Sequence, residues 1–156
     1  MKQLPKLKKD FIYARDFARA TPAELFGRDA WEAARELSIE TMEHTLLEQK
    51  DDGTFVARPL PARLQWSSVH ALEPLRDGSR SVLAGGNFLN ANIEMGWYDA
   101  GRLSMIDFST AGDATVRAIG GLPPGQVRRI RRIGLADGTA AFLVAYNNGP
   151  LRLLVR

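Results

Sequence analysis

The sequence predicts a mainly β protein that begins with an α-helical segment, and three observations support this fold class. In the first 39 residues, apolar side chains recur every three or four positions, which is the period of a helix. After Ile39 the period falls to two, which is the period of a strand. About nine short strands then follow, separated by Gly, Pro, Asp and Asn, as in sandwiches, barrels and propellers. We therefore expect a helical segment over residues 1–39 and a β region over residues 40–156.

The composition is that of an ordinary globular domain. The chain has 156 residues, of which 45% are hydrophobic and 25% charged. No apolar run approaches the ~20 residues that span a bilayer, and the basic stretch after Met1 lacks the apolar segment of a signal peptide. Cysteine is absent, which excludes disulfides and thiolate chemistry. The net charge of +3 comes from interspersed basic and acidic residues, which favours a solvated surface.

Two helices are expected in the first 27 residues. In the first, one helical face collects Leu4, Leu7, Phe11, Ala14 and Ala18. The second begins in TPAELFG, where Thr21 and Glu24 have the spacing of a capping box and Pro22 takes the first helical position. Gly27 can end this helix.

A third helix is expected in AWEAAREL. Asp29 is placed to cap it, with Glu32 at the capping-box position. Its buried stripe would consist of Trp31, Ala34 and Leu37.

The β region is expected to start with a hairpin. TMEHTLLEQ and TFVARPL have strand patterns, and DDG between them is typical of a hairpin turn. Further strands are expected at residues 67–75, 80–84, 102–108, 114–119, 127–135, 140–145 and 151–155.

The β region also contains an internal repeat. A shift of sixty residues places Asp77-Gly78 on Asp137-Gly138 and Asn87 on Asn147. The strand before each Asp-Gly also recurs, with a slip of two residues, and the first hairpin recurs with Val56 on Val116. A four-stranded unit that recurs in this way is typical of a propeller blade, although two hairpins can also be similar by chance.

At these residues the chain resembles the C-terminal part of FG-GAP/VCBS-repeat proteins, which are integrin-α-like β-propellers. The resemblance is carried by GTFVARPLP, SVLAGGNF, MGWYDAG and AFLVAYNNGPLRLLVR, in that order. The opening KQLPKLKKDFIYARDFARATPAELFG is similar to a helical insertion before the last blades of that group. Such proteins occur beside ASPIC/UnbV domains in bacterial envelope and secreted proteins, so the resemblance implies that compartment.

The resemblance implies a partial β-propeller of about two four-stranded antiparallel blades. Residues 41–59 would form the outer half of one blade, 67–119 a complete blade and 127–156 the inner strands of a last one. A ring needs roughly 4–8 blades, so further blades, copies of the chain or a protein partner would complete it. The strands could instead pair again as a compact sheet.

Blades of this family often carry a calcium loop rich in aspartate, and the corresponding stretch here has lost most of its ligands. Only Glu73 and Asp77 keep carboxylates, and Leu75 takes a ligand position. In the second copy Asp137 stands alone. We therefore expect no cofactor, no metal and a purely structural role for Asp-Gly in the turns.

No catalytic constellation is evident. His44 and His70 each lie in a predicted strand without a second metal ligand at suitable spacing, so packing is expected for both. The serines lack a nucleophile elbow, and the glycine-rich stretches match no phosphate-binding motif.

VRRIRRIG contains the strongest basic cluster: Arg128, Arg129, Arg131 and Arg132. Strict alternation places Ile130 on one face with Arg128 and Arg132, and Val127 on the other face, which is a poor amphipathic strand. We therefore expect a bulge or an exposed edge there. The cluster would pair with surface carboxylates or contact a phosphate or an acidic glycan. Nucleic acid is not an expected partner, because no aromatic residues are interleaved.

The best candidate binding site is the long connection 86–102. It combines amides, carboxylates and aromatic rings, which sugar and peptide contacts use: Asn87, Asn92, Glu94, Trp97, Tyr98 and Asp99. Family members carry a similar E-x-G-x-Y-D-A element, matched here from Glu94 to Ala100. Alternatively, Trp97 and Tyr98 pack the loop down and Asp99 caps a turn.

The sequence thus predicts a non-catalytic binding or scaffold module for a protein partner or ligand. The alternatives are a lectin-like carbohydrate-binding domain that uses the loop 86–102, and a subunit or accessory domain of an enzyme. No membrane span is expected.

Overall fold

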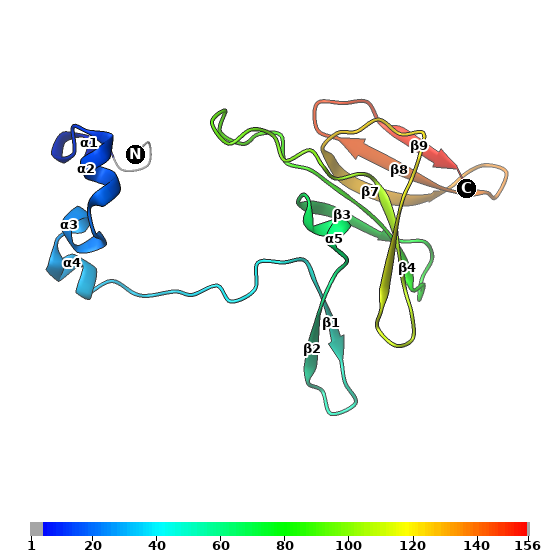
Figure 1. The fold of residues 1–156 in the computed structure, drawn as a ribbon. Helices are drawn as coiled ribbons and strands as arrows, with labels where there is room; N and C mark the ends of the chain where they lie inside the picture. Colours follow the sequence, from blue (N-terminus) through cyan, green and yellow to red (C-terminus); the bar gives the residue numbers. More distant parts are fainter. Residues whose placement is uncertain (1–4, 156) are drawn as a thin grey trace. The chain divides into compact units, whose positions relative to one another are not determined.

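The structure is a computed structural model that describes residues 5–155, and the chain is mainly β. It divides into two compact units, Met1–Thr41 and Met42–Arg156. Within the described residues the second unit holds nine strands in three antiparallel sheets (Figure 1). No closed barrel or closed propeller is formed by residues 5–155.

The helical unit contains four short helices. These are α1 (Leu7–Asp10), α2 (Ala14–Arg19), α3 (Pro22–Phe26) and α4 (Arg28–Glu32). The expected first helix is therefore two helices, because Tyr13 adopts an extended conformation with φ −99° and ψ 132°. Phe11 and Phe17 contact each other edge to face across this break. Leu4 lies outside the described residues.

The capping box at Thr21 and Glu24 is confirmed, and Gly27 ends α3 with a φ of +87°. The expected third helix is present as α4, but its predicted cap, length and buried stripe were wrong. Its N-cap is Gly27 rather than Asp29, it ends at Glu32, and Trp31 and Leu37 are exposed. A helix this short needs tertiary contacts to extend, and the apolar stripe found none within the unit.

All nine expected strands are present, and within each sheet the strands pair in their order along the chain. The first sheet is the hairpin β1 (Thr45–Gln49) and β2 (Phe55–Pro59). The second has the order β3 (Val69–Pro74), β4 (Ser81–Gly86), β5 (Ser104–Phe108) and β6 (Ala114–Ala118). The third has the order β7 (Val127–Gly134), β8 (Ala140–Tyr146) and β9 (Arg152–Val155). One short helix, α5 (Ala62–Gln65), was not foreseen.

The strand pairings of the two larger sheets correspond at the spacing of the expected repeat. The β3–β4 pairs recur in β7–β8 with shifts of 58 and 60 residues, which is the two-residue slip seen in the sequence. Even the bulge recurs, between Val69 and Ala71 and between Val127 and Arg129. The pairing of β4 with β5 also recurs in β8–β9.

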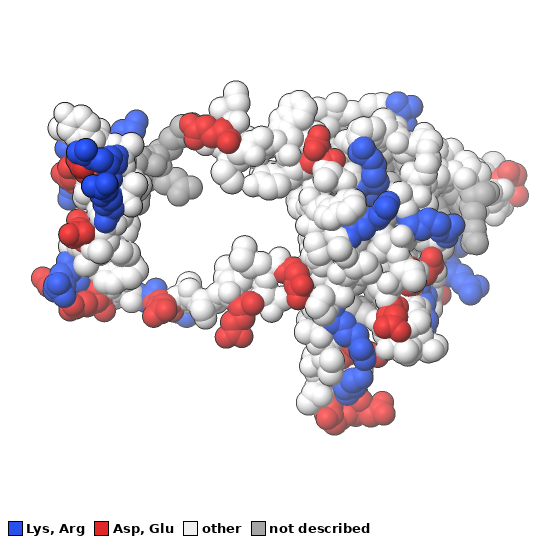
Figure 2. All heavy atoms as spheres, in the orientation of Figure 1, with Lys and Arg blue, Asp and Glu red and all other residues white. Residues whose placement is uncertain are grey.

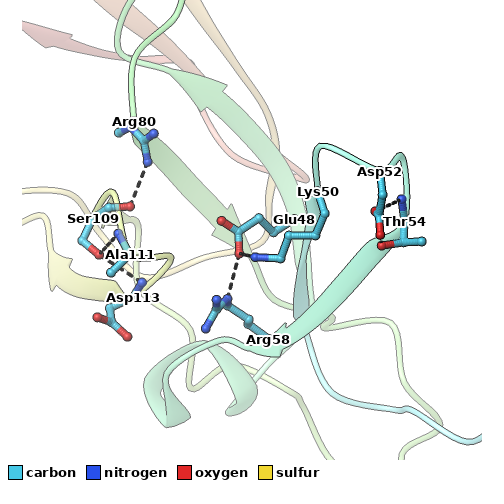
Figure 3. Close-up of polar contacts among 9 residues, drawn as sticks. All are labelled: Glu48, Lys50, Asp52, Thr54, Arg58, Arg80, Ser109, Ala111 and Asp113. Carbon is cyan, nitrogen blue, oxygen red and sulfur yellow. Dashed lines mark hydrogen bonds and ion pairs between the residues drawn. The ribbon is translucent and has the colours of Figure 1, made fainter.

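The hairpin β1–β2 recurs in β5–β6 at a shift of 59 residues, not 60. The sequence alignment of Val56 with Val116 was therefore wrong by one position, because Ala57 takes that place. The correct register also matches two ion pairs, Glu48–Arg58 at 3.0 Å and Asp107–Arg117 at 3.8 Å. Figure 3 shows the first of these, with Lys50 on the same carboxylate.

The four-stranded sheet is packed on both faces. One face meets the three-stranded sheet in a core that contains Leu83, Ile130, Phe142 and Val144. Ala84 and Ile106 on the other face pack against Leu64 of α5.

The glycine pair at the end of β4 marks a close approach of other strands. A Cβ on Gly86 would lie 1.8 Å from the carbonyl oxygen of Ser68, and one on Gly85 would lie 2.8 Å from Cγ1 of Val127. The start of β3 and the start of β7 can therefore lie this close to β4 only because Gly85 and Gly86 carry no side chain.

Candidate functional site

The two copies of the repeat differ most in the connection that follows the second strand of each sheet. In the second copy, residues 147–151 join β8 to β9. In the first copy, residues 87–103 join β4 to β5, so this connection is twelve residues longer. The insertion projects from the end of the sheet as a two-armed loop (Figure 1).

The base of this loop is fixed to the sheet, and its tip is exposed. Phe88 and Tyr98 form an isolated antiparallel bridge, and the Ser67 hydroxyl donates a hydrogen bond to the Tyr98 carbonyl. Beyond the bridge, Ile93 is 92% exposed and Trp97 is 71% exposed. Both side chains therefore face solvent, and the alternative in which Trp97 packs the loop down does not hold for the described residues.

The remaining predicted loop residues lie on the same exposed segment. Asn92 donates a 3.3 Å hydrogen bond to the Glu94 carboxylate. Tyr98 is 43% exposed, and Asp99 is exposed beside it. Five of the six predicted residues are thus accessible together.

Asn87 is the exception, because it is only 1% exposed. Its Oδ1 accepts from the Gly101 amide at 2.8 Å, and its Nδ2 donates to the carbonyls of Gly101 and Gly125 at 3.1 and 3.0 Å. The side chain is thus fully engaged inside the protein, and the backbone takes a φ of +82°, which Asn tolerates. The prediction that Asn87 contacts a ligand was therefore wrong. Its side chain instead connects the base of the loop to the segment that leads into the next sheet.

A pocket that the sequence did not indicate lies at the end of the second copy. It has a volume of about 440 Å³ and lies among three connections, which contribute Asn90, Pro124, Asn147 and Arg152 among others. Tyr146 forms part of its wall. Burial raises the pKa of this phenol, and the positive charge of the nearby Arg152 offsets only part of the rise. The recurrence of Asn87 as Asn147 was the one sequence signal for this place.

The basic strand β7 is an edge strand with a bulge, as expected. The bulge at Arg128 departs from strict alternation and allows both Val127 and Ile130 to be buried. All four arginines are exposed. Arg131 forms an ion pair with Oε2 of Glu73 at 3.4 Å. The other carboxylate oxygen of Glu73 accepts a hydrogen bond from the Arg132 amide at 2.9 Å.

Charges on the face in Figure 2 are mixed rather than gathered by sign, as Lys and Arg lie among Asp and Glu. This agrees with the interspersed charges of the sequence. The arginines of β7 are therefore a local feature of one strand.

The candidate metal and histidine positions have other contacts. Glu73 joins β3 to β7 through both of its carboxylate oxygens. His44 contacts the Leu64 carbonyl through Nδ1 at 2.8 Å, and His70 contacts the Ser68 hydroxyl at 3.0 Å. Within residues 5–155 no group of three or more His, Asp or Glu side chains could hold a metal ion.

Two Asp-Gly-Thr turns show what the acidic turn residues do. Asp52 accepts from the hydroxyl and the amide of Thr54 at 2.6 and 2.9 Å (Figure 3). Asp137 accepts from the Thr139 amide at 2.9 Å. These hydrogen bonds lower the pKa of both carboxyls, the Thr54 hydroxyl contributing most for Asp52 and the Thr139 amide most for Asp137.

These features define a class: a mainly β protein with a helical unit, in which antiparallel strands repeat in register and one copy carries an exposed aromatic loop. No helix of the described chain is long and apolar enough to cross a membrane. Comparison with protein-family models, with curated proteins and with solved structures finds no match to this chain.

Proposed function

We propose that the chain is a non-catalytic binding and scaffold module of a repeat protein of the β-propeller type, and that the loop 86–102 contacts its partner. The observation that carries this proposal is the insertion itself. One copy of an otherwise regular repeat has gained twelve residues whose tip exposes Ile93 and Trp97. Exposed aromatic and aliphatic side chains on a loop with an anchored base are typical of contact surfaces.

The scaffold role is supported by positions that are buried in one copy of the repeat and exposed in the other. Ile106 is 2% exposed, whereas its counterpart Leu47 in the first hairpin is 62% exposed. Ile130 is 2% exposed, whereas its counterpart Leu72 is 61% exposed. Further strands that cover these positions would complete the packing, as an adjacent blade of a propeller does.

The strand positions also indicate what would complete each sheet. In the repeat, β1 and β2 correspond to β5 and β6, the outer strands of the four-stranded sheet. The first hairpin thus lacks two inner strands. The sheet β7–β8–β9 lacks one outer strand, the counterpart of β6. These requirements favour strands of a different partner segment over a second copy, which would supply the position of β9 twice.

A lectin-like role is the second candidate function, since the loop presents Asn92, Glu94, Trp97 and Tyr98 on one exposed segment. Amides and carboxylates bond sugar hydroxyls, and an indole provides an apolar face for a sugar ring. An accessory domain of an enzyme is the remaining alternative. The family resemblance supports a cell-envelope or secreted location for this module.

Peptide and glycan arrays probed with the full chain test the loop. Binding that falls at least tenfold with Trp97→Ala supports the proposal, because aromatic anchors dominate contact energies. Trp31→Ala, at an exposed tryptophan of the helical unit, is the matched control and should have no effect. Binding to glycans alone that is lost with Trp97→Ala would favour the lectin role. Binding that neither substitution changes would refute the proposal that the loop is the contact.

A further inference from the structure

The repeat allows a direct comparison of the two asparagines that follow β4 and β8. The Asn87 amide donates to the Ser68 carbonyl at 2.9 Å, and the Asn147 amide donates to the Gln126 carbonyl at 2.8 Å. Ser68 and Gln126 each immediately precede the first strand of their sheet. Asn87 and Asn147 therefore occupy the same structural position.

The side chain of Asn87 shows what this position does when the next sheet is present. One of its hydrogen bonds goes to the carbonyl of Gly125, in the segment that leads from β6 into β7. That segment contains Pro123 and Pro124 directly before Gly125. Asn87 thus fastens a proline- and glycine-containing lead-in segment through a main-chain carbonyl.

The side chain of Asn147 has no such segment to hold within the described chain. Its Nδ2 donates to Oε1 of Gln126 at 2.8 Å, which uses one of its two hydrogens. Gln126 is only 1% exposed, and its Nε2 has no hydrogen-bond partner among the described residues. The two side-chain amides of Asn147 and Gln126 therefore have unused donor hydrogens. A buried donor without an acceptor costs free energy, so an additional acceptor at this place would be stabilising.

The 440 Å³ pocket lies at this place. Pro123, Pro124, Pro150 and Tyr146 form apolar walls, and Asn147 and Arg152 contribute donors. Proline and tyrosine surfaces suit an extended polyproline-type segment, whose carbonyls remain free to accept hydrogen bonds.

We propose that this pocket binds an extended peptide segment, rich in proline and glycine, whose main-chain carbonyls accept hydrogen bonds from the side-chain amide of Asn147. The occupant is the lead-in segment of a further sheet, held as Asn87 holds Gly125. The inference rests on the proposed scaffold role and adds the chemistry by which the next sheet is attached.

The test is a titration of the ¹⁵N-labelled full chain with a capped peptide of its own lead-in segment, residues 121–127. Saturable chemical-shift changes should appear at residues 146–152, with a Kd of about 1 mM or below, since a short peptide buries little surface. The same peptide with its residues scrambled should bind at least tenfold more weakly.

Asn147→Asp should weaken binding of the peptide at least tenfold, because it removes the donor and keeps the shape. Thr110→Asp is the control for charge, since it adds one negative charge at an exposed residue that lies outside the pocket. Asn147→Ala, which adds no charge, serves as a second variant if the aspartate disturbs folding.

The proposal is overturned if no saturable shift appears up to several times that Kd, if both aspartate variants weaken binding equally, or if neutral oligosaccharides shift residues 146–152 and the peptide does not. Trp97→Ala should leave peptide binding unchanged. A failure at the pocket is therefore distinct from a failure of the loop.

Discussion

The four-stranded and three-stranded sheets follow one plan, but only the first is packed on both faces. Their strands share register and bulge position, and yet matched residues differ in burial. Matched asparagines differ in the same way, because Asn87 has three partners from its side chain and Asn147 has one. The difference teaches that the backbone plan is set within each sheet, whereas the burial of a side chain depends on the neighbouring sheets.

The largest expected effect breaks this comparison at the asparagines. Asn87→Asp should destabilise the protein by about 3 kcal/mol or more, because a buried carboxylate would face the carbonyls of Gly101 and Gly125. Asn147→Asp should cost much less, since the side chain lies at a pocket that solvent reaches. Urea unfolding followed by circular dichroism measures both, and equal losses would contradict the comparison.

A second contrast concerns apolar side chains at matched positions. Ile106→Ala should cost about 2–5 kcal/mol, because Ile106 is buried against Leu64 and Ala84. Leu47→Ala should cost less than about 1 kcal/mol, because its side chain is exposed. The same unfolding assay applies, and a large loss for Leu47 would show that the hairpin is already covered in solution.

The contact between the sheets provides a smaller effect. Glu73→Ala should cost about 1–2 kcal/mol, since it leaves the Arg132 amide without its acceptor and removes the ion pair with Arg131. Its counterpart in the repeat, Arg131, is exposed, so Arg131→Ala should stay within about 0.5 kcal/mol of the unchanged protein. Thermal unfolding of the two variants side by side would sharpen this contrast, and reversed order would refute it.

The smallest effect concerns the two Asp-Gly-Thr turns. Because their folded pKa values are lowered, Asp52 and Asp137 contribute stability above the ordinary pKa of an aspartate, and this contribution is lost as pH falls through the folded values. Thr54→Val should raise the pKa of Asp52 noticeably, because the hydroxyl is the main cause there. Thr139→Val should raise the pKa of Asp137 less, because the backbone amide, which both substitutions keep, is the larger cause in that turn. Carboxyl titrations by NMR would distinguish the two turns, and equal shifts would contradict the assignment.

The sequence located the strands well because period-two runs and Asp-Gly turns are local signals. It failed where distant contacts decide. The burial of Asn87 depends on Gly101 and Gly125, which lie 14 and 38 residues away along the chain. The pocket at Asn147 depends on residues from separate connections, and its relation to Asn87 becomes evident from the matching backbone hydrogen bonds of the two asparagines.

The candidate loop was located from its composition, but the reason for its prominence came from the structure. Only the comparison of residues 87–103 with residues 147–151 shows that it is an insertion into a regular unit. The short helix α5 was missed because its four residues lie between prolines and a tryptophan, with no helical period to detect.

Every strand of the chain pairs only with strands next to it in sequence, and this has a consequence for how the protein forms. Contacts between near neighbours close small loops, so their entropic cost is low and folding is expected to be fast. All strands of the four-stranded sheet are outside the ribosome once Ala118 has emerged, before β7 emerges. Folding is therefore expected to proceed during synthesis, each finished sheet serving as the template on which the next one is laid down.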